Sequence, residues 1–145
     1  MYHHILISTD GSELAERAVI HGLSLAKSVG AKVTVIIVEE VFNLQPLAEA
    51  GTLEHLSLYA EQIKKFAASA LNRAANAAKQ AGVSCDTLQV GNAPPYQAII
   101  ATATDLGCDL IVMASHGRSG LSALLLGSVT YKVLTYTKTP VLVCQ

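Results

Sequence analysis

The sequence "DLIVMASHGRSGLSALLLGSVTYKVL", residues 109–134, joins an apolar run, a glycine-rich loop and a segment with helical spacing. Two common phosphate-binding motifs do not fit the loop. A Walker loop has lysine after its last glycine, whereas Gly127 is followed by Ser128. A dinucleotide fingerprint needs G-x-G-x-x-G, whereas Gly117 and Gly120 supply only G-x-x-G. The loop therefore has to be interpreted from its place in the fold.

On the N-terminal side of this unit, short apolar runs alternate with longer segments of helical spacing. Segment 39–57 has no clear period and contains proline and glycine, so we expect either a mobile cover or a short helix there. The alternation predicts an open parallel sheet with helices on both faces, an α/β fold in a single domain of residues 1–145. The expected strands are 4–9, 32–38, 84–90, 109–115 and 139–145, and the expected helices are 11–30, 58–81, 94–107 and 128–138.

The composition narrows the class of function. Hydrophobic residues make up 51% of the chain and charged residues 14%, which suits a sheet that is buried on both faces. A net charge of −1 and the lack of a long basic cluster argue against a nucleic-acid partner. The sequence has no apolar run long enough to span a membrane, and its N-terminus does not resemble a signal peptide, so we expect a cytoplasmic protein.

No pattern in the sequence predicts a metal centre or a catalytic group. The three cysteines are widely spaced and lie in or beside apolar runs, as small buried side chains do. The histidines show no metal-ligand spacing, and no Ser/His/Asp arrangement or carboxylate pair stands out. We therefore expect at most slow nucleotide hydrolysis.

Ligands of an open parallel sheet bind beyond the carboxyl ends of the strands, where the strand order reverses. The loop after the fourth strand is the best equipped of the loops at that edge. Gly117 and Gly120 allow backbone N–H groups to turn inward, and Ser128 and Thr130 stand at the start of the next helix, where negative charge is favoured. The sequence thus predicts a phosphate site without lysine. The alternative is a plain crossover, with Ser128 as the helix N-cap.

Three other side chains near this edge have two interpretations each. Asp10 could cap the first helix, with Glu13 completing a capping box, or it could accept hydrogen bonds from a ligand's base or ribose. His116 and Arg118 flank Gly117 and could point toward a bound anion or lie in solvent.

These segments together resemble the universal stress protein family. The resemblance covers "ILISTDGSELAERAV", "VTVIIVEE", "GNAPPYQAII", the stretch 109–134 and the closing "TPVLVCQ". The family's signature is G-x-x-G, nine residues, and G-S/T; here Ala114 to Gly117 are followed by residues 118–126 and then by Gly127-Ser128. The resemblance implies a Rossmann-like sheet in the order 3-2-1-4-5, with its reversal between strands 1 and 4. It also implies ATP, with or without Mg²⁺, as the ligand.

The resemblance also implies roles for individual residues. Asp10 and Val38 would hold adenine and ribose, and the fourth loop with the following helix start would hold the phosphates. This chain departs from the family at Ala114, which replaces the first signature glycine, and at Ser8, which replaces a frequent proline. The full candidate nucleotide site is Asp10, Val38, Met113, Ala114, His116, Gly117, Arg118, Gly127, Ser128, Val129 and Thr130.

Further expectations concern the activity as a whole. The leading hypothesis is a stress-response module that binds ATP and acts as a nucleotide-dependent switch or sensor. The alternative is a homodimeric interaction protein of the same fold that binds no nucleotide. In either case we expect a homodimer through residues 140–144, an apolar sheet edge. We also expect segment 39–57 to gate the base site, and the Ala114 methyl to contact the nucleotide and weaken its binding about tenfold.

Overall fold

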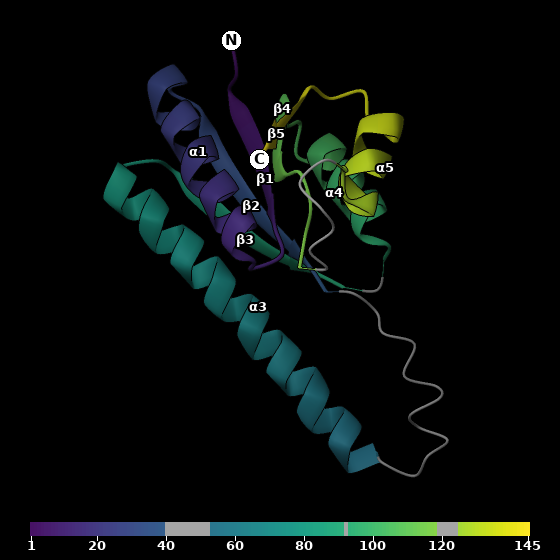
Figure 1. Cartoon of the computed structure of the whole chain (residues 1–145). Helices are drawn as coiled ribbons and strands as arrows, with labels where there is room; N and C mark the ends of the chain where they lie inside the picture. Colours follow the sequence, from purple (N-terminus) through teal and green to yellow (C-terminus); the bar gives the residue numbers. More distant parts are fainter. Residues whose placement is uncertain (40–52, 92, 119–124) are drawn as a thin grey trace.

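Five short apolar runs of the sequence form one parallel sheet (Figure 1). The computed structural model describes residues 1–39, 53–91, 93–118 and 125–145 of the chain. The strand order is β3-β2-β1-β4-β5, so it reverses between β1 and β4, as the family resemblance implies. The elements are β1 (His4–Thr9), α1 (Glu13–Val29), β2 (Lys32–Val38), α3 (Leu53–Ala81), β3 (Cys85–Val90), α4 (Pro95–Asp105), β4 (Leu110–Ala114), α5 (Ser128–Tyr136) and β5 (Val141–Cys144).

Helices cover both faces of the sheet, which confirms the predicted α/β architecture. Helices α1 and α3 lie on one face, and α4 and α5 lie on the other (Figure 1). In the central strand β1, Ile5 and Ile7 pack on the side of α1 and α3, while Leu6 packs on the side of α4 and α5. All three are fully buried. Burial on both faces explains why this strand is a continuous apolar run and not an alternating one.

Helix α1 packs closely on the sheet because most of its buried residues are small. Ala15, Ala18, Gly22 and Ala26 all belong to its buried face. A Cβ at Gly22 would lie 2.6 Å from Cδ1 of Ile7, so glycine is needed for this approach. Helix α1, which follows the loop after β1, is therefore held close to the central strand.

The start of α1 shows that Asp10 is not the N-cap of this helix. The N-cap is Ser12, whose hydroxyl accepts a hydrogen bond from the backbone N–H of Ala15 at 3.2 Å. Glu13 is the first helical residue, so the predicted capping box with Asp10 does not form. The interpretation of Asp10 as the cap is wrong, because the chain makes one more turn at Gly11, with φ +78°, before the helix begins.

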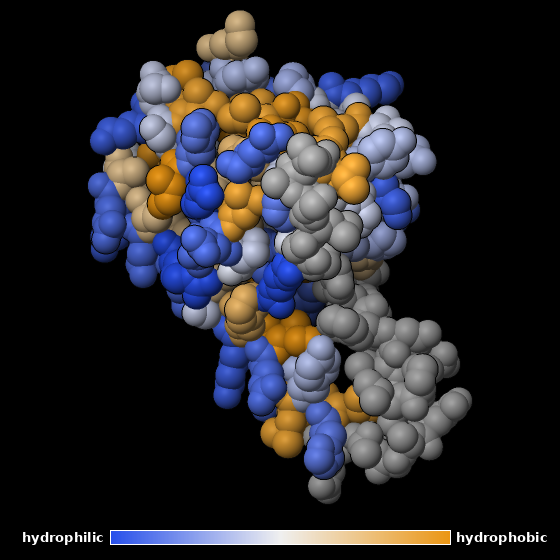
Figure 2. Space-filling model, viewed as in Figure 1, coloured by the Kyte–Doolittle hydropathy of each residue, from blue (hydrophilic) through white to orange (hydrophobic). Residues whose placement is uncertain are grey.

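Helix α3 begins at Leu53, five residues before the predicted start at Leu58. It is 29 residues long, which corresponds to about 43 Å, and its N-terminal part extends past the sheet (Figure 1). Apolar surface is visible on this part of the helix (Figure 2), where the side chain of Leu58 is 59% exposed. The proposed gating segment 39–57 lies mainly outside the described residues, at 40–52. In the part of the chain that the structure describes, no helix is both long and apolar enough to cross a membrane.

Candidate functional site

The loops after β1 and β4 meet where the strand order reverses, and Asp10 joins them. One oxygen of its carboxylate, Oδ1, accepts the backbone N–H of Ser12 at 2.9 Å. The other, Oδ2, accepts the backbone N–H of Arg118 at 3.1 Å. The carboxylate is therefore placed between the start of α1 and the glycine-rich loop. Sequence reasoning put Asp10 at this edge, and the structure brings it together with Gly117 and Arg118.

Gly117 allows this close contact between the two loops. A Cβ at this position would lie 2.5 Å from Oδ2 of Asp10. Any other residue would push the carboxylate away or displace the loop. The requirement here is space, since the φ of this glycine is not positive.

Gly127 is needed for a second close approach, at the other end of the loop. Its backbone N–H donates to the carbonyl oxygen of Ser115 at 2.7 Å. A Cβ at Gly127 would lie 3.0 Å from Cα of His116 and 3.4 Å from the carbonyl oxygen of Ser115. The chain that leaves β4 and the chain that enters α5 thus run against each other with bare backbone at the contact.

The start of α5 supplies backbone donors beside this contact. Its N-cap is Gly127, which has no side chain to accept a hydrogen bond, so the interpretation of Ser128 as the N-cap is wrong. Ser128, Val129 and Thr130 form the first turn, and the first N–H groups of a helix have no partner within it. The Thr130 hydroxyl, which is buried, donates to the carbonyl oxygen of Ala114 at 2.9 Å and fixes the helix start to the end of β4. The arrangement suits an anion bound by backbone groups.

The apolar candidates lie on two sides of the sheet. Val38, Met113 and Val129 belong to one cluster, on the side of α4 and α5, and Met113 is only 4% exposed. Ala114 belongs to a different cluster, in which its methyl group packs with Ala15 and Ala18 of α1. The methyl group therefore contacts α1, whereas sequence reasoning directed it toward a nucleotide.

The two charged or titratable candidates of the loop differ in their contacts. Nδ1 of His116 lies 3.1 Å from the Ser115 hydroxyl, and the side chain is half-buried. Arg118 is exposed, and its guanidinium carbon lies 3.8 Å from the ring centre of Phe66 in α3. Its Nε also donates to the backbone oxygen of Asp10 at 3.1 Å. Arg118 is therefore held by α3 and by the loop after β1.

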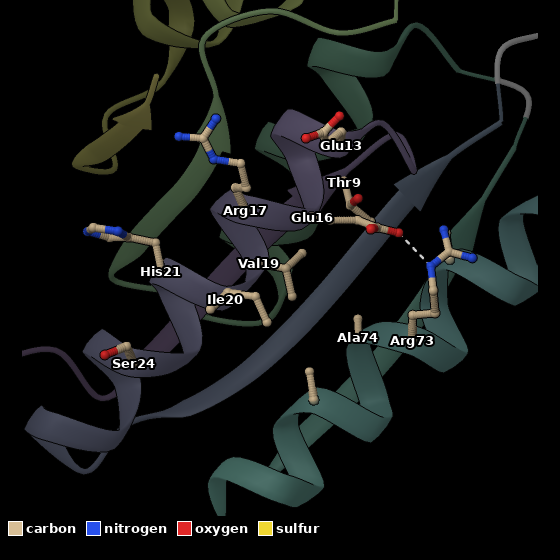
Figure 3. Close-up of a pocket in the computed structure, with 12 residues that line it drawn as sticks. Thr9, Glu13, Glu16, Arg17, Val19, Ile20, His21, Ser24, Arg73 and Ala74 are labelled. Carbon is tan, nitrogen blue, oxygen red and sulfur yellow. Dashed lines mark hydrogen bonds and ion pairs between the residues drawn. The ribbon is translucent and has the colours of Figure 1, made fainter.

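A groove between α1 and α3 has a volume of about 590 Å³, and its lining includes Thr9 and Glu13 at the two ends of the loop after β1. Figure 3 shows Arg73 of α3 reaching toward Glu16 of α1, where its Nε lies 2.5 Å from a carboxylate oxygen. Arg17 and His21 point away from α3 in the same view. The described residues that line the groove include none of those expected to bind nucleotide.

Burial controls the titratable groups of the described core. Desolvation, and to a smaller extent the charge of Lys32, lowers the pKa of His4. Nδ1 of this histidine lies 3.2 Å from the carbonyl oxygen of Leu106, and its Nε2 lies 2.8 Å from the Thr34 hydroxyl. Desolvation raises the pKa of Cys108 to about 11, so this thiol is unreactive at neutral pH. Among the described residues, no group of three or more His, Cys, Asp or Glu side chains could hold a metal ion.

The universal stress protein family model matches residues 1–145. The chain belongs to this family. Universal stress protein MJ0531 of Methanocaldococcus jannaschii is 34% identical over 145 residues, which are all of this chain and 83% of that protein. The solved structure of MJ0577, from the same organism, has a TM-score of 0.78 and 30% identity, and the match covers 99% of this chain and 96% of that one. A universal stress protein solved in complex with cAMP has a TM-score of 0.70 and 26% identity, over 99% and 97% of the two chains.

One residue that contacts the loops after both β1 and β4 could not be identified from the sequence, namely Phe66. Phe66 lies against Gly11 and under Arg118, although it is far from both in sequence. The helical spacing assigned it to the apolar face of α3, which is the only signal that the sequence contains.

Proposed function

We propose that this universal stress protein binds ATP or a related adenine nucleotide between the ends of β1 and β4, and acts as a nucleotide-dependent stress-response module. The observation that carries the proposal is the bare backbone at Gly117 and Gly127, where a Cβ would clash with Asp10 or with the backbone of His116. Backbone without side chains at both positions would also let a phosphate approach the N–H groups closely. The structure solved with cAMP supports an adenine nucleotide as the class of ligand.

Each part of the nucleotide has a suitable group at this site. The Asp10 carboxylate would accept hydrogen bonds from the ribose or the base, and Val38 would contact the base beside Met113. The N–H groups at the start of α5 would bind phosphate oxygens. Mg²⁺ prefers oxygen ligands and would be held mainly by the phosphates themselves. The residues proposed to bind are Asp10, Val38, Met113, Ala114, His116, Gly117, Arg118, Gly127, Ser128, Val129 and Thr130, with Ala114 contributing only its backbone.

A first experiment asks which nucleotide the protein carries. Protein purified without added nucleotide is denatured, and the released small molecules are identified by chromatography and mass spectrometry. We expect an adenine nucleotide. ATP, AMP and cAMP are then titrated into nucleotide-free protein by calorimetry. Absence of binding at millimolar concentrations of all three would reject the proposal.

Two glycine variants test whether the bare backbone at the site is needed. Gly127→Ala places a methyl group 3.0 Å from Cα of His116 and should weaken nucleotide binding at least tenfold. Gly91→Ala is the matched control, because among the described residues a Cβ there meets only Glu39 Oε2, at 3.7 Å. Equal titration curves for Gly127→Ala and the parent would show that the glycine serves the turn alone.

One observation favours the alternative function, a homodimeric interaction protein. Strand β5 is at the edge of the sheet, and each of its apolar residues is only half-buried. An apolar edge of this kind is usually covered or paired. A dimer through β5 is also compatible with nucleotide binding, so the titrations above decide between the two functions.

A further inference from the structure

Arg118 makes three contacts that connect the glycine-rich loop to the rest of the molecule. Its backbone N–H donates to Oδ2 of Asp10 at 3.1 Å, and its Nε donates to the backbone oxygen of Asp10 at 3.1 Å. Its guanidinium carbon lies 3.8 Å from the ring centre of Phe66, well within the range of a cation–π interaction. Backbone and side chain of one residue therefore act on the same neighbouring loop.

Phe66 is itself fixed against the first loop. A Cβ at Gly11 would lie 2.6 Å from Cε1 and 2.7 Å from Cζ of the ring, so only a glycine leaves space for Phe66 there. The next turn of α3 continues the contact, because Ala70 lies 3.4 Å from the same position. With Arg118 against it the side chain of Phe66 is still 40% exposed, so the contact lies at the surface.

These contacts engage the same groups that the proposed ligand would use. Both oxygens of the Asp10 carboxylate accept N–H groups of the chain itself, from Ser12 and Arg118. The cationic head of Arg118 is engaged with α3 and the first loop. The start of α1 and the glycine-rich loop thus each hold one oxygen of the Asp10 carboxylate.

We propose that Arg118, Asp10 and Phe66 form a latch that holds the nucleotide site closed in the absence of ligand, and that Phe66 is a positioning residue acting through Arg118. The inference rests on the proposed nucleotide function. A nucleotide that bonds to Oδ2 of Asp10 competes with the Arg118 N–H for this oxygen, because the loop backbone at Gly117 already lies close against it. Its apparent affinity is then lowered by the fraction of molecules in which the latch is closed.

The size of the effect follows from the exposure of the contact. Cation–π interactions at exposed sites are weak, and their loss changes an equilibrium by about two- to fivefold. Phe66→Leu keeps an apolar side chain against Gly11 but removes the aromatic face. We expect this variant to bind nucleotide about two- to fivefold more tightly than the parent, while Phe66→Tyr, which keeps the ring, binds like the parent.

The latch can also be measured without any nucleotide, because trypsin cleaves after arginine. The ligand-free parent, Phe66→Leu and Phe66→Tyr are digested under native conditions, and the fragment that ends at Arg118 is followed by mass spectrometry. Cleavage after Arg118 should be faster in Phe66→Leu and unchanged in Phe66→Tyr. Cleavage after Lys27 serves as the internal reference for global stability, since this residue lies in the last turn of α1.

The outcomes separate the latch from the proposed function. Faster cleavage together with tighter nucleotide binding in Phe66→Leu supports the latch. If the parent binds nucleotide and Phe66→Leu is cleaved after Arg118 at the same rate as the parent, the latch is rejected. Weaker nucleotide binding by Phe66→Leu also rejects the latch, because the contact would then organise the open site. If no variant binds nucleotide, the proposed function fails, and the latch is rejected as a control of binding whatever the cleavage rates.

Discussion

Replacing Ala114 by glycine should destabilise the protein and leave nucleotide affinity unchanged. The residue is 8% exposed, and its methyl group packs against Ala15 and Ala18, which are 2% and 0% exposed. Loss of one buried methyl group costs about 0.8 kcal/mol, and glycine within a strand costs roughly 0.5–1 kcal/mol more. The free energy of unfolding should therefore fall by about 1.5 kcal/mol. For a chain of this length the entropy of unfolding is about 0.3 kcal/mol/K, so the melting temperature should fall by about 5 °C.

The assay combines calorimetric melting with ATP titration of the parent and of Ala114→Gly. Thr87 in the exposed part of β3 offers a matched control. The variants Thr87→Ala and Thr87→Gly differ by the same methyl group, so their difference measures the backbone cost of glycine without the packing. From the sequence alone the opposite is expected for Ala114→Gly, namely tighter binding and unchanged stability. That result would refute a packing role for the Ala114 methyl group.

Two further predictions concern acid stability and assembly. Because burial lowers the pKa of His4 in the folded state below 6.5, the unfolded chain takes up a proton first as the pH falls. The contribution of His4 to the free energy of unfolding should therefore be fully present above pH 6.5 and decline below it. His4→Gln should flatten this decline in melting curves measured from pH 7.5 to pH 5, and an equally steep decline would exclude His4 as its cause. For assembly, the carbonyl oxygens of Pro140 and Cys144 accept hydrogen bonds from the N–H groups of Ile111 and Ser115, so the backbone groups of Val143 point away from the sheet. Val143→Pro should therefore convert a β5-paired dimer to a folded monomer in light scattering. Leu142→Pro removes an inward donor and should lower the melting temperature. A dimeric Val143→Pro protein would show that another surface assembles it.

The sheet could be predicted from the sequence because its strands are buried on both faces. Continuous apolar runs such as Ile5 to Ile7, all fully buried, are typical of a strand that is covered on both faces. The strand order came from the resemblance to a family, since alternation of strands and helices does not fix it. The reversal between β1 and β4 then located Asp10 and the glycine-rich loop together.

The helix starts were harder to predict, because neighbouring residues compete for the same role. Asp10 and Ser12 are both good N-caps, and the backbone at Gly11 decides in favour of Ser12. The same competition separates Gly127 from Ser128 at α5. The contact between Phe66 and Arg118 could not be predicted at all, since helical periodicity identifies a buried face but not its partner across the fold.

The small residues of α1 have a consequence for how the site responds to temperature. Alanine and glycine have no rotamers to lose, so packing Ala15, Ala18 and Gly22 against the sheet costs almost no side-chain entropy. At these three positions the helix itself has no long side chain that could rearrange to absorb a shift. The distance between α1 and the central strands should therefore stay nearly constant on warming, and with it the position of the loop that carries Asp10.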